Sequence, residues 1–212
     1  MDFGSPTTDP TKGAMLYSYD RPPSAREVYI RGSLFAPLPR FIQRELGPAG
    51  WQEFLKRVDP VASTVLGGEF VALAWYPFTV VTSTVEILST MGRAMGKPDL
   101  LRKMTTDNLD QATRGIFRAI FKIGSPEFMI KRSDHVWKKF YSAGEMTVDV
   151  ATKGEAIIRL ERVPNMTPLY SQVVMYSMQA VIEKAGGVVT RAEMTSDIAK
   201  GDPRSEYHYR WK

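Results

Sequence analysis

Two histidines are the residues of this chain best suited to acid–base or metal chemistry. His135 and His208 lie far apart in the sequence, and neither belongs to a nucleophile motif, a phosphate-binding glycine loop or a dinucleotide fingerprint. Asp107 and Asp110 are spaced to share a helix face, but carboxylates at this spacing are common surface features. The absence of cysteine excludes disulfides, thiolate-held zinc and cysteine nucleophiles. The sequence therefore predicts a protein that is not an enzyme, without a cofactor or a metal.

Large aromatic and methionine side chains recur at helical spacing through the middle of the chain. For any one of them, packing in a core is the simplest interpretation. As a set they are denser than packing requires, and bulky, adaptable side chains are typical of apolar ligand pockets. If a pocket exists, we expect its lining to be Phe70, Trp75, Tyr76, Phe78, Phe117, Phe121, Trp137, Tyr141 and Met175. Phe140 belongs to the same pattern of aromatic residues.

The elements that would position these side chains fall into two groups. Apolar residues three and four apart predict helices in the first part of the chain, and alternation of apolar and polar residues predicts strands after Gly144. The order favours an α+β fold in which a helical layer packs on a four-stranded antiparallel sheet. The expected elements are a strand at 28–32, helices at 33–46, 48–58, 75–95, a helix from 99 or 106 to 123, 125–141 and 165–185, and strands at 145–150, 156–162, 188–194 and 205–211.

The length and composition of the chain indicate its domain organisation and its cellular compartment. The chain has 212 residues, enough for one large domain. Residues 1–27 are rich in Pro, Ser, Thr, Gly and Asp, which predicts a mobile N-terminal arm before a single domain at 28–212. No apolar run is long enough to span a bilayer, and the N-terminus does not have the pattern of a signal peptide. We therefore expect a cytoplasmic protein.

The net charge of +5 allows several partners. The basic residues are spread along the chain, whereas a nucleic-acid binder usually gathers them on one face. A solvated, mildly cationic surface is the favoured interpretation, while nucleic acid and an anionic membrane surface stay open.

Three stretches resemble a known family. They are Trp75-Tyr76-Pro77-Phe78, the helix from Ser125-Pro126 through Trp137-Lys138-Lys139-Phe140-Tyr141, and the ending from Lys200-Gly201-Asp202-Pro203 to Tyr209-Arg210-Trp211. They are similar to a myxobacterial paralogous family of unknown function, which in turn resembles 4-vinyl-reductase domains, haem-NO-binding sensor domains and TRAPP vesicle-tethering subunits. The similarity covers roughly residues 28–212. It implies helices packed on an antiparallel sheet, an apolar pocket between them for haem, aromatic effectors or acyl chains, and in several relatives dimerisation.

The chain departs from these relatives at two functional points. Where 4-vinyl-reductase-like domains often carry zinc-binding cysteines, this chain has Thr195-Ser196 and Ser205, and hydroxyls do not replace thiolates around zinc. The Tyr-x-Ser-x-Arg signature of the haem-NO sensors, which holds the haem propionates, is absent. His135 is the one candidate axial haem ligand by its place on a helix, and Ser133-Asp134 beside it favours a surface role.

Two functions remain after these exclusions. The first is a non-enzymatic signalling or regulatory module that binds a hydrophobic small molecule or a protein partner. The second is a dimeric scaffold or interaction protein whose core is filled by its own side chains. The presence or absence of a ligand-sized space beneath Trp75 and Trp137 would distinguish them.

Overall fold

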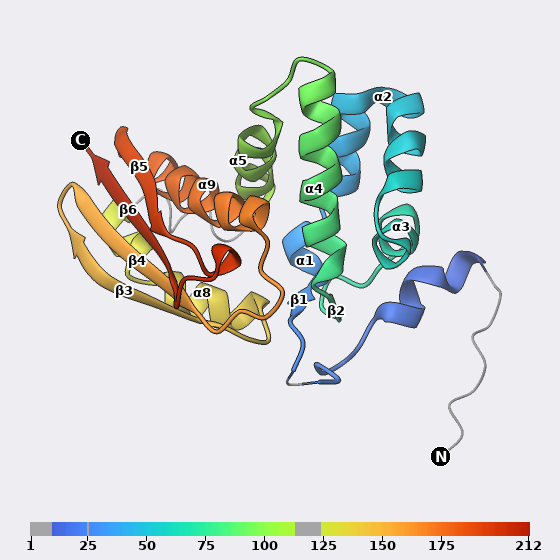
Figure 1. Cartoon of the computed structure of the whole chain (residues 1–212), viewed down its shortest axis with the longest axis horizontal. Helices are drawn as coiled ribbons and strands as arrows, with labels where there is room; N and C mark the ends of the chain where they lie inside the picture. The colour runs from blue at the N-terminus through green and yellow to red at the C-terminus, as the bar shows by residue number, and fades with distance from the viewer. Residues whose placement is uncertain (1–9, 25, 113–123) are drawn as a thin grey trace.

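The computed structural model of the chain describes residues 10–24, 26–112 and 124–212. A helical half and a sheet half lie side by side, with helices α5 (Leu100–Ala112) and α9 (Pro168–Lys184) where the halves meet (Figure 1). The predicted α+β class, a helical layer on a four-stranded antiparallel sheet, is confirmed. In the described part of the chain no helix is both long enough and apolar enough to cross a membrane.

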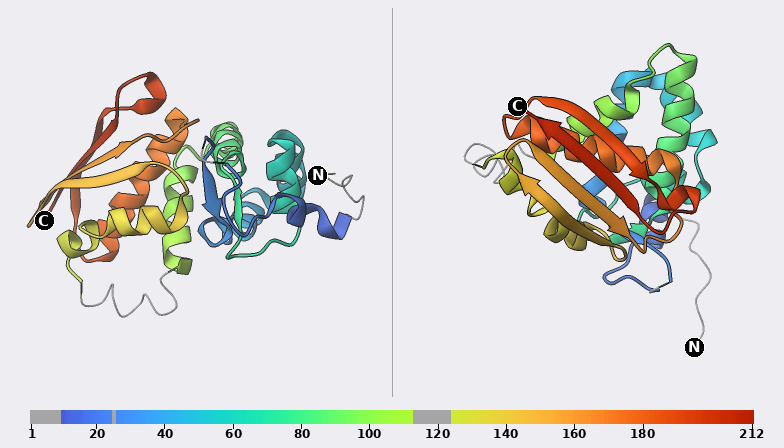
Figure 2. Two further views of the ribbon diagram at one scale, coloured as in Figure 1. Left: turned by 90° about the horizontal axis from the view of Figure 1, so that it is seen from below. Right: turned by 60° about the vertical axis from the view of Figure 1, so that its left-hand side comes forward.

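The sheet half contains the four-stranded antiparallel sheet, in the order β3-β4-β6-β5. Its strands are β3 (Glu145–Thr152), β4 (Glu155–Glu161), β5 (Val189–Ser196) and β6 (Ser205–Trp211). Alternate residues of β4 and β6 are buried, so one face of the sheet belongs to the core. Helix α9 packs on that face, and the opposite face comes forward uncovered in the right-hand view of Figure 2.

The helical half begins with a 3-10 helix, η1 (Pro10–Tyr17), which packs against α3 (Pro60–Gly67). The short strands β1 (Tyr29–Arg31) and β2 (Trp75–Pro77) then pair antiparallel to each other. Around them lie α1 (Gly32–Phe35), α2 (Leu38–Arg57) and α4 (Thr79–Ala94). Two short helices, α7 (Pro126–Ile130) and α8 (Ser133–Phe140), lead into the sheet, and a 3-10 turn, η2 (Ile198–Lys200), joins β5 to β6.

The structure corrects several predicted boundaries. The helix predicted from residue 75 begins only at Thr79, because residues 75–77 pair with β1 as a strand. The helix predicted over 125–141 is divided into α7 and α8 by a turn at 131–132. Helix α3 was not predicted at all, although Asp59 caps it and Pro60 starts it in the usual way. The boundary predicted at Gly47-Pro48 is confirmed, because α2 consists of two helical segments that meet at a non-helical Gly47. The helix predicted over 33–46 differs only at its start, where a turn at 36–37 separates α1 from α2.

Gly47 shows why the kink occurs where the sequence has Gly-Pro. Its backbone has φ 71° and ψ 175°, a conformation open essentially to glycine alone. Pro48 then has no N–H to donate to the preceding turn. The chain therefore changes direction inside α2 and keeps both segments packed on the core through Leu46 and Trp51.

Candidate functional site

An apolar cavity of about 230 Å³ lies between the helical half and the sheet half. The helical half contributes walls from α1, α2, α4 and α5, and the sheet half contributes α8, β3 and α9. Its apolar lining residues are Leu34, Phe35, Leu38, Val81, Val85, Met104, Leu109, Val136, Trp137, Phe140, Met146, Val173, Val174, Met178 and Val181. Its polar lining residues are Ser33, Thr105, Asn108, Ser133, Tyr141, Tyr170 and Ser177. None of the described lining residues is charged.

Two of the polar residues that line the cavity are tyrosines in contact with each other. The hydroxyls of Tyr141 and Tyr170 are joined by a hydrogen bond of 2.7 Å. Burial raises the pKa of Tyr141 to about 12 and raises the pKa of Tyr170 well above its ordinary value. Both side chains are therefore neutral hydroxyls throughout the physiological pH range.

Aromatic contacts hold the two tyrosines in place. Trp137 and Tyr141 stack with their ring centres 3.7 Å apart and an interplanar angle of 4°. Phe78 meets Tyr141 and Tyr170 edge-on, at 6.4 and 4.8 Å. The indole N–H of Trp137 donates to the carbonyl of Ala143 at 3.0 Å, which also holds the indole in place.

Local sequence explains the position of Tyr170. The Thr167 side chain accepts a hydrogen bond from the Tyr170 amide, and Pro168 is the first residue of α9. Tyr170 therefore lies in the first turn of α9. Val173, Val174 and Ser177 follow at helical spacing along the same lining.

The structure brings only part of the predicted pocket set to the cavity. Trp137 and Tyr141 line it, and Phe78 packs directly against its tyrosines. Phe70 and Tyr76 lie one layer away, because they pack against Phe35, itself a lining residue, at 5.0 and 5.4 Å.

The other predicted residues lie elsewhere. The Trp75 ring is covered by the guanidinium of Arg31 at 4.2 Å and is not part of the lining. Met175 is on α9, and its carbonyl accepts a hydrogen bond from the Tyr209 hydroxyl. Phe117 and Phe121 lie outside the described residues.

Sequence reasoning missed the contribution of α9 to the cavity. Tyr170, Val173, Val174, Met178 and Val181 follow one another three or four positions apart, so the signal was present as a stripe. Aliphatic residues at this spacing do not stand out from ordinary core packing. Of this helix only Met175 was predicted, and it lies on another face.

The cavity does not suit haem. The chain has two histidines and no cysteine, and neither histidine is a lining residue. The His135 side chain is 84% exposed and contacts Asp134, while His208 contacts Glu206 on the sheet. No charged residue in the described lining could pair with propionates, and a cavity of about 150 Å³ holds one benzene, so 230 Å³ is far too small for a tetrapyrrole. Among described residues, no three His, Asp or Glu side chains gather to hold a metal ion.

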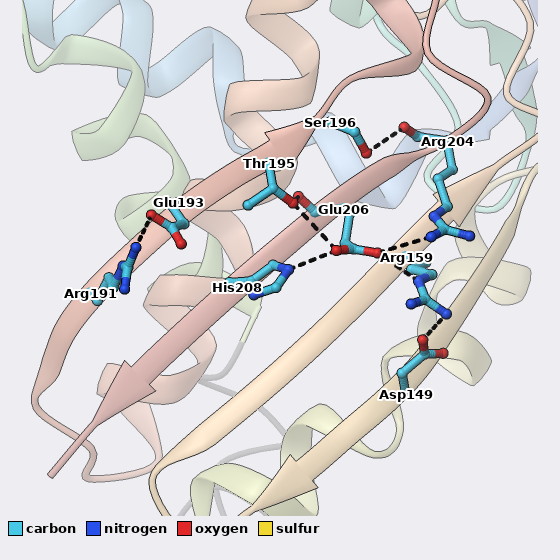
Figure 3. Close-up of polar contacts among 9 residues, drawn as sticks. All are labelled: Asp149, Arg159, Arg191, Glu193, Thr195, Ser196, Arg204, Glu206 and His208. Atoms are coloured by element: carbon cyan, nitrogen blue, oxygen red, sulfur yellow. Dashed lines mark hydrogen bonds and ion pairs between the residues drawn. The ribbon is translucent and has the colours of Figure 1, made fainter.

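The uncovered sheet face carries an ionic network centred on Glu206 (Figure 3). Its carboxylate contacts the Arg159 guanidinium at 2.7 Å, the His208 ring at 2.8 Å and Arg204 at 3.4 Å. Arg159 also pairs with Asp149, so the network joins β3, β4 and β6. The hydrogen bonds from Arg159 and His208 lower the pKa of Glu206 to about 2. Every ionic group in this cluster has a partner, which indicates a structural role.

Comparison with known proteins identifies the fold. No family model matches the chain, and no curated protein matches it. An H-NOX protein from K. algicida, in its Fe(II) unliganded state, superposes with a TM-score of 0.64 at 10% identity, covering 86% of this chain and 97% of that one. A mutant H-NOX protein from S. oneidensis in the Fe(II) state gives 0.63 at 12% identity, covering 86% and 96%. The chain therefore has the fold of H-NOX domains, which agrees with the expected haem-NO-sensor architecture.

Proposed function

We propose that this chain is a non-enzymatic signalling or regulatory module that binds a hydrophobic small molecule in the cavity between its two halves. The proposal includes a cytoplasmic location and leaves room for a protein partner or a homodimer. The narrower kinship with a myxobacterial paralogous family, and through it with 4-vinyl-reductase and TRAPP domains, remains a prediction.

One observation carries the proposal: a ligand-sized apolar cavity, partly open to solvent beside Val136, lies at the place where the two halves meet. Burial of apolar surface would supply most of the affinity, at about 25 cal/mol per Å² before the costs of association. The H-NOX fold supports a sensing role by analogy, since those neighbours are described in Fe(II) states without a ligand and with NO. The cavity also speaks against the alternative of a scaffold with a completely filled core.

The proposal is for an organic ligand and not for haem, because the described lining supplies neither an axial histidine nor a partner for propionates. Protein produced with added haem is therefore expected to show no Soret band above that of free haem. A stoichiometric Soret band would contradict this part of the proposal.

Native mass spectrometry of protein purified from its own host tests the proposal directly. The wild-type chain is expected to carry a co-purifying small mass. Val174→Phe should lose it, because Val174 is a buried lining residue and the added ring would occupy the cavity.

Val188→Phe is the matched control, since Val188 is 66% exposed and its added ring would meet solvent. The control should retain the mass. A wild-type chain without any bound mass, or the same mass on all three proteins, would contradict a ligand in this cavity.

A further inference from the structure

We infer that Tyr141 and Tyr170 are the recognition point of the cavity, donating a hydrogen bond to the oxygen of a neutral, mostly hydrocarbon ligand such as a small ketone. This inference rests on the proposed function, because it describes what the same cavity selects. It assigns the chemical class of the ligand and the two residues that distinguish that class from plain hydrocarbons.

The hydrogen-bond donors of the cavity point to the tyrosine pair. Thr105 and Ser177 donate their hydroxyl protons to main-chain carbonyls, each at 2.8 Å, and the Asn108 amide donates to the Leu34 carbonyl at 2.8 Å. Ser33 is exposed to solvent. The Ser133 hydroxyl contacts a methionine sulfur at 3.4 Å. The tyrosine pair has two protons and one bond between its oxygens, so one proton is left for another acceptor. A buried hydroxyl proton without an acceptor costs free energy, and a ligand oxygen would remove that cost.

The lining also defines the charge of the ligand. No charged side chain lies among the described lining residues, and the two tyrosines are held neutral by burial. An isolated charge transferred into such a space would lose its hydration without gaining a counter-ion. The cavity therefore favours neutral molecules over carboxylates of the same shape.

The volume sets the size of the ligand. A cavity of about 150 Å³ lined by aliphatic and aromatic residues binds benzene. By proportion, 230 Å³ suits a molecule of roughly nine non-hydrogen atoms. The stacked rings of Trp137 and Tyr141, together with Phe140 in the lining, give such a molecule an aromatic wall.

Three probes of one shape test the inference: acetophenone, which is neutral with an oxygen acceptor, isopropylbenzene, which lacks the acceptor, and benzoate, which is charged. Dissociation constants are measured by ligand-observed NMR at neutral pH. With the wild-type chain, acetophenone should bind about 3- to 10-fold more tightly than isopropylbenzene, the value of one net hydrogen bond. Benzoate should bind more weakly than either probe.

The double variant Tyr141→Phe/Tyr170→Phe should remove the preference for the ketone and leave the affinity for isopropylbenzene within about twofold, because only the hydroxyls are lost. Tyr176→Phe is the control, since Tyr176 lies on α9 but outside the lining, and it should keep the preference. Thermal unfolding checks that each variant folds. If the double variant does not, the two single variants are compared in the same way, and each should reduce the preference.

The outcomes distinguish failure of this inference from failure of the proposed function. Equal binding of acetophenone and isopropylbenzene to the wild-type chain would overturn the inference and leave the proposed function intact. The same holds for a ketone preference that survives in the double variant, which would point to Asn108, or for benzoate as the tightest probe. Failure of both neutral probes to bind would overturn the proposed function together with the inference.

Discussion

At the residue scale, Glu206 shows how one carboxylate can connect three strands. It lies opposite Arg159 in the register of β4 and β6, and the two side chains are in direct contact. Only 17% of the Glu206 side chain is exposed, so solvent screens these contacts less than it screens ordinary surface pairs. The bonds also explain why the carboxylate is more acidic than an ordinary glutamate.

This acidity predicts a pH dependence of stability. The pKa of Glu206 is lowered from 4.5 to about 2 in the folded chain, so the ionised form favours folding. The contribution is complete above the unfolded pKa and is lost as the pH falls from about 4.5 toward 2. Glu206→Gln should therefore lower the free energy of unfolding at pH 7 by about 1 kcal/mol, after allowance for partial solvent screening.

Urea denaturation of both proteins between pH 7 and pH 2 measures this effect. The difference between wild type and Glu206→Gln should shrink as the pH approaches 2. Glu193→Gln is the matched control, because Glu193 forms a more exposed pair with Arg191 on the same sheet face (Figure 3). A constant difference at every pH, or an equal effect in the control, would show that the ionic network does not stabilise the sheet.

At the element scale, Gly144 determines how α8 is joined to the sheet. It has φ 90° and lies between the end of α8 and the start of β3. A Cβ at this position would lie 2.5 Å from a methyl group of Val163 and 3.1 Å from the indole nitrogen of Trp137. The connection between α8 and the sheet therefore needs glycine at residue 144 for two reasons, the positive φ and the lack of room for a Cβ.

Gly144→Ala should destabilise the chain through both the backbone and the contact. Gly96→Ala is the matched control, because Gly96 also has a positive φ, 69°, but nothing lies within 4 Å of its added Cβ. The control should cost about 1 kcal/mol and Gly144→Ala about 1–3 kcal/mol more, as measured by chemical denaturation. Equal losses in the two variants would mean that the contacts around Gly144 adapt without cost.

The elements that sequence could predict are those with a local signal. The hairpin of β3 and β4, the helix α9 and the strand β6 have clear periodicity and turn residues, and they occur close to where the sequence predicted them. The strand β2 was mistaken for a helix because Trp75-Tyr76-Pro77 is too short to show alternation. Its structure depends on pairing with β1, which lies far earlier in the chain.

At the scale of the whole molecule, the N-terminal segment makes contacts with the folded domain. Residues 1–27 were expected to form a mobile arm. In the structure Ala14 is 1% exposed, and Tyr19 exchanges two main-chain hydrogen bonds with Trp75, at 3.0 and 2.8 Å. These contacts favour a segment that docks on the folded domain.

Hydrogen exchange distinguishes a mobile N-terminal arm from an N-terminal segment that is docked on the folded domain. The amides of Tyr19 and Trp75 are expected to exchange slowly and at similar rates, because each donates to the other residue's carbonyl. The amide of Arg26, which donates to the Ser24 hydroxyl at 3.0 Å in an exposed hydrogen bond, is the comparison within the same protein. Rapid exchange at Tyr19, as fast as at Arg26, would support the mobile arm.

The candidate site was less predictable than the fold. Sequence indicated that apolar residues of the central helices line a space, and Trp137 and Tyr141 do so. It could not show which face of each helix meets which neighbour, so it included Trp75 and omitted Tyr170. That information lies in the packing of α9 against α5 and the sheet, a contact between segments distant in sequence.

The cavity walls range from Ser33 to Val181, and no short stretch of the chain contains them all. The cavity therefore forms only when α9 has packed against the rest of the chain, and the proposed ligand would bind the native state and not the unfolded chain. Such a ligand raises thermal stability in proportion to the logarithm of its concentration. Two preparations of the same chain, one still loaded and one stripped during purification, would consequently melt at different temperatures.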